Sequence, residues 1–100
     1  MTSPLFRVLV VGRHPGLLAS VIQRLRDQGY DATGVSTDEE ALSLSEGTWD
    51  ALVIGGGVEP ASREAISAAF RTAQPEIKII HAHPESLFRQ LAEALGPLSD

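Results

Sequence analysis

Hydrophobic and polar positions along this chain follow two alternating patterns. Short runs of mainly apolar, often β-branched residues occur four times, and after each run apolar residues recur every three or four positions. The first pattern is typical of buried strands and the second of amphipathic helices. The chain therefore predicts four strand–helix units, with strands at residues 6–11, 31–35, 51–54 and 77–82.

Proline and glycine mark where the predicted helices begin and end. Proline suits the first position of a helix, and glycine suits the residue just after its end. The second helix has a capping-box pattern, with Thr37 followed three residues later by Glu40. The expected helices begin at Pro15, Thr37, Pro60 and Pro84, and the expected stops include Gly29, a position near Gly47, and Gly96.

The strands and helices together predict an α/β fold. Short, nearly continuous apolar strands separated by helices indicate a parallel sheet that is covered on both faces. Right-handed crossovers then favour a flavodoxin-like, doubly wound (βα)₄ sheet with strand order 2-1-3-4, formed by a single domain over residues 1–100. In that order the loops after the first and third strands meet at the crevice where such folds bind ligands.

Composition and charge exclude several classes of function. The 100 residues are 43% hydrophobic and carry a net charge of −5, with lysine and arginine scattered along the chain. Without a basic stripe, nucleic acid is not an expected partner. The chain has no cysteine, which excludes disulfides and thiolate metal sites. Its apolar runs are short, so we expect neither a signal peptide nor a membrane-spanning segment. We expect a soluble cytoplasmic protein with no membrane partner.

Three stretches carry a resemblance to a known family: "VLVV" before a loop with Pro15, "QGYDATGVSTDEEAL", and "WDALVI". From about Phe6 to Pro84 the sequence resembles the CheY-like receiver domains of bacterial response regulators. That family uses acidic residues to hold Mg²⁺ and to accept a phosphoryl group on one aspartate. The resemblance implies a signalling role and the same fold.

The positions that match the family's functional residues differ from its pattern. Gly12 and Arg13 stand in place of the acidic pair, Gly55 in place of the phosphoacceptor, and His83 in place of the phosphorylation-sensing Ser/Thr. The family's lysine has no counterpart, because the chain stops about one βα unit early. We therefore expect a degenerate, truncated pseudo-receiver that is non-catalytic, independent of phosphorylation and without a cofactor.

The glycine-rich loops leave an alternative open. Glycine lets backbone amides approach a phosphate closely, so these loops could form the anion pocket of a nucleotide or phosphate sensor, with Arg13 as a charged fork. The glycines could equally serve only to make tight turns. The candidate ligand-binding residues are Gly12, Arg13, His14, Gly55, Gly56, Gly57 and His83.

The histidines suggest half of a metal site. His81 lies in the predicted fourth strand and His83 two residues further on, so the two share one side if the strand extends that far, and His14 is the remaining candidate ligand. The histidines are equally explained as polar loop residues that tolerate the geometry before a proline, and no metal is expected.

The fourth strand also predicts a partner surface. An edge strand whose backbone groups are unpaired is a template for another chain unless it is covered or charged. We expect a homodimer at this edge, with candidate interface residues Ile77, Ile79, His81 and Phe88. Burial further predicts that the last helix joins the first on one face of the sheet, so that its residues Leu87, Phe88, Leu91 and Leu95 pack beside Leu18 and Ile22.

Overall fold

Four parallel strands form one sheet in the order β2-β1-β3-β4. The structure is a computed structural model that describes residues 6–82 and 86–96. Each helix follows a strand in the chain, which gives the (βα)₄ sequence of elements. The flavodoxin-like α/β fold and its strand order are therefore confirmed. The strands are β1 (Arg7–Val11), β2 (Asp31–Val35), β3 (Ala51–Ile54) and β4 (Lys78–His81).

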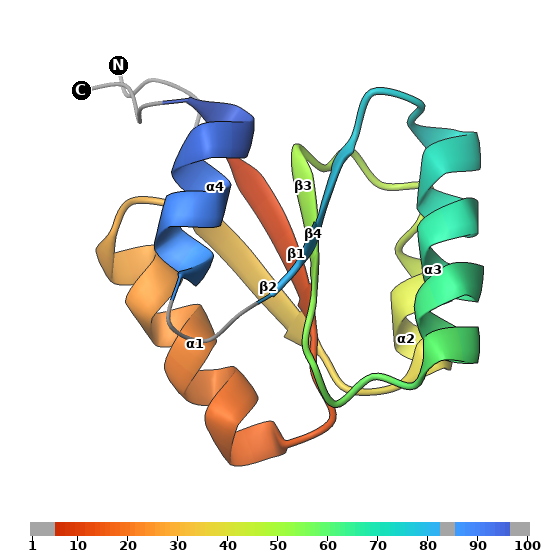
Figure 1. Ribbon diagram of the computed structural model, residues 1–100, viewed down its shortest axis with the longest axis horizontal. Helices are drawn as coiled ribbons and strands as arrows, with labels where there is room; N and C mark the ends of the chain where they lie inside the picture. The colour runs from red at the N-terminus through yellow and green to blue at the C-terminus, as the bar shows by residue number, and fades with distance from the viewer. Residues whose placement is uncertain (1–5, 83–85, 97–100) are drawn as a thin grey trace.

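Two helices cover each face of the sheet (Figure 1). On one face lie α1 (Pro15–Asp27) and α4 (Leu87–Leu95), and on the other lie α2 (Asp38–Ser43) and α3 (Pro60–Ala73). This arrangement places α4 beside α1, as expected from burial. The guanidinium of Arg24 in α1 lies 5.0 Å from the centre of the Phe88 ring in α4.

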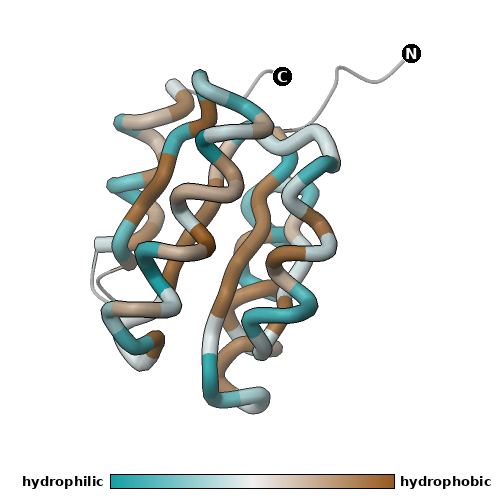
Figure 2. The backbone as a smooth tube through the Cα atoms, turned by 90° about the vertical axis from the view of Figure 1, so that its right-hand side faces the viewer, coloured by the Kyte–Doolittle hydropathy of each residue, from teal (hydrophilic) through white to brown (hydrophobic). Residues whose placement is uncertain are grey.

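The core consists of two apolar clusters that the sheet separates. The cluster between the sheet and α1/α4 includes Val10, Leu25 and Leu91, and the cluster beneath α2 and α3 includes Leu52 and Phe70. Brown, hydrophobic stretches of the tube follow the strands that run between the helices (Figure 2). Because residues alternate in direction along each strand, β1 and β3 contribute to both clusters.

Capping residues explain most of the helix boundaries. Gly29 has φ 103° and follows the last turn of α1, where a left-handed residue is favourable. The hydroxyl of Thr37 accepts a hydrogen bond from the Glu40 N–H at 3.1 Å, as the capping box requires. Two boundaries differ from expectation: α2 ends at Ser43 rather than near Gly47, and α4 begins at Leu87. The expected start at Pro84 lies outside the described residues.

On each edge of the sheet, a side chain satisfies one outward backbone carbonyl. On β2, the Ala32 carbonyl accepts hydrogen bonds from the Arg26 guanidinium at 3.1 and 3.0 Å. On β4, the His81 carbonyl accepts from the Gln90 amide at 3.0 Å. Ile79 also points its N–H and C=O away from β3, and within residues 6–82 and 86–96 neither group has a hydrogen-bond partner. On β2, Gly34 likewise points its N–H and C=O away from β1, and neither group has a hydrogen-bond partner among the described residues. Each edge therefore has one occupied carbonyl and one residue whose backbone groups are open.

The register of the strands brings their carboxyl ends to one end of the sheet. Val11 is paired with both Val35 and Ile54, and Ile54 is paired with His81. The loops that follow β1, β2 and β3 therefore meet at this end, where α/β sheets commonly bind ligands. This is the region in which the candidate site lies.

Candidate functional site

An arginine joins the three loops at the carboxyl end of the sheet. Arg13 follows β1, and its Nη2 lies 2.5 Å from Asp38 Oδ1 and 3.1 Å from Glu59 Oε2. Its Nη1 donates to the Ser36 carbonyl at 2.9 Å. Ser62 in α3 completes the group by donating to Asp38 Oδ2 at 2.6 Å. We call Arg13, Asp38, Glu59 and Ser62 the arginine clasp.

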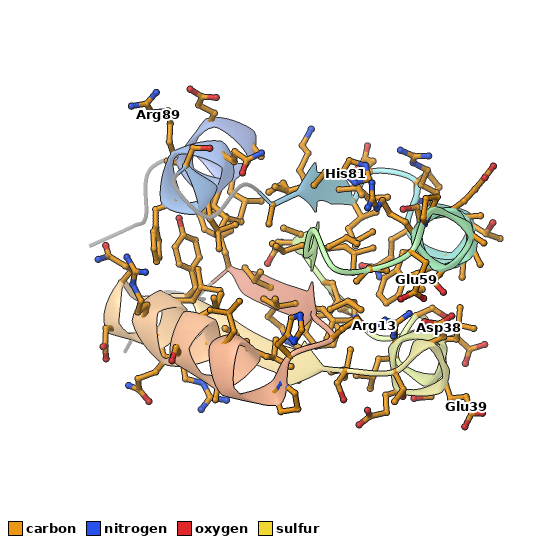
Figure 3. The ribbon with its side chains drawn as sticks, turned by 60° about the horizontal axis from the view of Figure 1, so that its bottom comes forward. Arg13, Asp38, Glu39, Glu59, His81 and Arg89 are labelled. Atoms are coloured by element: carbon orange, nitrogen blue, oxygen red, sulfur yellow. The ribbon has the colours of Figure 1, made fainter. Side chains whose placement is uncertain are left out.

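Local structure explains why these side chains converge. Arg13 lies in the loop between β1 and α1, Asp38 opens α2, and Glu59 is the residue just before α3. Figure 3 shows Arg13 directed toward Asp38 and Glu59, between the first loop and the two helices on the opposite face. The clasp therefore ties together three elements that are distant in the sequence.

Electrostatics within the clasp favour the charged forms. The hydrogen bond from Ser62 and that from Arg13 lower the pKa of Asp38 below its ordinary value of 3.8. Arg13 lowers the pKa of Glu59 below 4.5, and the two carboxylates raise the pKa of Arg13. All three groups are accordingly ionised at neutral pH.

The lowered pKa values predict how stability depends on pH. A carboxylate whose pKa is depressed in the folded state contributes stability above its unfolded pKa and loses that stability as pH falls through the folded pKa. We therefore expect Arg13→Gln to lower the urea midpoint at pH 7, and the difference from the wild type to shrink below about pH 4.5. Arg71→Gln, an exposed change in the last turn of α3, is the control and should show no such trend. A difference that stays constant down to pH 3 would contradict this assignment.

The clasp changes the interpretation of Arg13. The sequence suggested a free charged fork for an anion, whereas the guanidinium is directed at two carboxylates and a carbonyl. The spacings to Asp38 and Glu59 are 25 and 46 residues, so no local motif could reveal these pairs. Knowing the strand order shows that the loops meet, but not which side chains bond.

A pocket of about 180 Å³ lies beside the clasp, between the sheet, α1 and the start of α4. Its lining is mainly apolar. In the part of the chain that the structure describes, the polar side chains on it are those of Arg13, His14 and Arg24, and none is a carboxylate. The apolar and glycine residues that line it are Val10, Val11, Gly12, Leu17, Leu18, Val21, Val53, Gly55, Gly56, Gly57, Ala82, Leu87 and Phe88.

Glycine is required for a physical reason at only one of the four glycine positions at this end of the sheet. A Cβ on Gly55 would lie 3.2 Å from the Val11 carbonyl oxygen, which is tight enough to disfavour any side chain. A Cβ on Gly12 or Gly57 would make only ordinary contacts, at 3.5 Å or more, and one on Gly56 would meet nothing within 4 Å. None of these four glycines has a positive φ. Close approach therefore accounts for Gly55, but not for the other three.

The structure separates two of the three histidines. His14 lines the pocket on the face of α1 and α4. His81 alternates with Ile80, which is buried on that face, and therefore points to the opposite one. His83 lies outside the described residues. Within the described ranges no three histidine or acidic side chains are grouped so as to hold a metal ion.

Comparison with solved structures places the fold among receivers. The chain is similar to the Vibrio cholerae chemotaxis protein CheY4 (TM-score 0.69, 16% identity, 92% of this chain and 100% of that one). It is also similar to a CheY-like receiver domain protein from Methanospirillum hungatei (0.66, 23%, 91% and 76%). A third similar structure is a pilus assembly-related protein from Burkholderia pseudomallei (0.59, 19%, 90% and 73%).

Comparisons at the level of sequence add no relatives. No protein-family model matches the chain, and no curated protein matches it. Among the described helices, none has the length and apolar character needed to cross a bilayer. The evidence from similarity is thus structural, and it shows that this chain has the fold of CheY-like receiver domains.

Proposed function

We propose that the chain is a cytoplasmic, receiver-like signalling module that acts through protein contacts, without phosphorylation and without catalysis. The arginine clasp is the observation that carries this proposal. Mg²⁺ binds to hard oxygen ligands, usually carboxylates. Here Asp38 and Glu59 are already bonded to the cation of Arg13, and β1 and β3 are followed by Gly12 and Gly55. These residues do not fit a magnesium-dependent phosphoacceptor site.

Treatment with acetyl phosphate tests this proposal. We expect the intact mass to be unchanged after incubation with acetyl phosphate and Mg²⁺, because no aspartate follows β3 at position 55. Beryllofluoride with Mg²⁺ should likewise leave the melting temperature unchanged. A receiver domain with an intact acidic cluster, treated in parallel, is the positive control. A mass increase of one phosphoryl group would refute phosphorylation independence.

The position of α4 matches that of a receiver's last helix. In a full-length receiver the final helix joins the first helix, and the helix after the fourth strand joins the second and third. Here α4 follows β4 directly and packs with α1. We infer that α4 takes the place on the sheet that the final helix has in a receiver.

We propose in addition that two copies pair through the β4 edge. The open backbone groups of Ile79 support this pairing, because an antiparallel mate related by a two-fold axis would satisfy them. Ile77 and His81 would flank the axis. Phe88, also a candidate, faces α1 and Arg24 instead, so the interface rests on the three β4-side residues.

A small-molecule sensor is the second candidate function. The observation that favours it is the pocket at the carboxyl ends of β1 and β3, in the position where α/β sheets bind ligands. Three glycines at its border are not required by close packing or by φ. Their lack of side chains keeps the pocket open.

A further inference from the structure

The proposed small-molecule sensor has no defined class of ligand. The volume of its pocket limits how large that ligand can be. Drug-sized ligands occupy pockets of roughly 300–1,000 Å³, whereas an apolar cavity of about 150 Å³ holds one benzene molecule. At about 180 Å³, this pocket matches a single ring rather than a nucleotide. Leu18, Val21, Leu87 and Phe88 supply apolar contacts of the kind that a ring requires.

Charge on the lining defines the ligand further. Among residues 6–82 and 86–96 no carboxylate lines the pocket, while His14 and Arg24 both do. Neither side chain makes a hydrogen bond or salt bridge to another residue in the described ranges. The Arg24 guanidinium makes a cation–π contact with the Phe88 ring. Arg13 is held by the clasp. The pocket therefore combines an apolar interior with two available basic groups.

Glycine at position 12 independently supports the presence of a ligand site in this pocket. Gly12 follows β1 on the α1 side, and a Cβ there would lie 3.5 Å from Leu18 Cδ1, inside the lining of the pocket. Neither φ nor a close contact requires glycine at this position. A side chain would be tolerated by the fold but would occupy the space available to a ligand.

We propose that this pocket binds a small aromatic acid, of about one ring with one anionic group. The ring lies among the apolar side chains of α1 and α4, and the anionic group faces Arg24, while His14 lies on the lining near the start of α1. This inference rests on the sensor proposed above and replaces its nucleotide or phosphate with a smaller, mainly apolar ligand.

Titration of the ¹⁵N-labelled protein with benzoate tests the proposal, and benzylamine of matched size but opposite charge is the comparison. We expect benzoate to give saturable amide shifts at Gly12, Val21 and Gly56, with an affinity at least about fivefold higher than that of benzylamine. Gly12→Val should abolish these shifts. Gly16→Ala, in the first turn of α1 but outside the lining, should leave them unchanged.

Arg24→Gln should remove the preference for benzoate while retaining weak binding of the ring, which separates loss of charge from loss of folding. Equal binding by wild type and Gly12→Val, or no preference for benzoate, would overturn the inference. ATP and inorganic phosphate are titrated in parallel. If ATP shifts these amide resonances and benzoate does not, the aromatic-acid inference fails, but the proposal of a small-molecule sensor stands. If no compound binds, both fail and the interaction module remains.

Discussion

Leu91→Ala should lower the free energy of unfolding by about 2–5 kcal/mol, because it leaves a cavity where α4 meets the core. Leu91 has no exposed surface and belongs to the cluster shared with α1. A domain of this size is stabilised by only about 5–15 kcal/mol, so this loss is a large fraction of the total. Urea unfolding followed by circular dichroism measures it.

Leu17→Ala is the matched control for Leu91→Ala. Leu17 is the same residue type in a helix on the same face, but 64% of it is exposed, so its truncation should change stability by less than about 0.5 kcal/mol. Equal effects of the two substitutions would show that α4 does not pack as described. A small effect of Leu91→Ala alone would lead to the same conclusion.

Light scattering at micromolar concentration should give twice the chain mass of 10.7 kDa for the wild type, and the single-chain mass for Ile79→Lys. The open N–H and C=O of Ile79 lie at the proposed two-fold axis, and lysines from both copies would meet there. A stable pair should bury about 1,000 Å² or more in total.

Leu42→Lys is the control for the dimer test, because it also replaces an aliphatic residue by lysine but lies on α2, away from β4. It should remain dimeric. His81→Glu provides a second edge variant at an exposed side chain and should also dissociate the pair. A monomeric wild type, or a dimer that persists in both edge variants, would remove the dimer proposal.

The sequence predicted the fold well because its strands and helices have distinct periodicities. The residues expected in β2 and β3 are those observed, and β1 and β4 differ by one residue at their ends. Burial also correctly predicted that α4 joins α1. Turn geometry was less predictable: after Ser43 the chain continues in turns that a capping pattern at Thr37 cannot foresee.

The candidate site was predicted only in its position. Strand order alone indicates that Gly12 and Gly55 lie at neighbouring loops, and the structure places both at the pocket. The partners of Arg13 depend on how two further loops orient their carboxylates, which no spacing encodes. For the same reason, the role of Ser62 in the clasp could not be anticipated.

The Arg26 contact on β2 has a consequence for how large an assembly can become. Open-ended filaments grow when each added subunit presents a fresh edge to the next one. If two copies join through β4, the outermost strands are both β2, where Arg26 already occupies the outward Ala32 carbonyl and Gly34 is open. A third copy that paired along β2 would have to displace that guanidinium. A two-fold contact through β4 is closed at that edge, and Arg26 opposes further growth through β2.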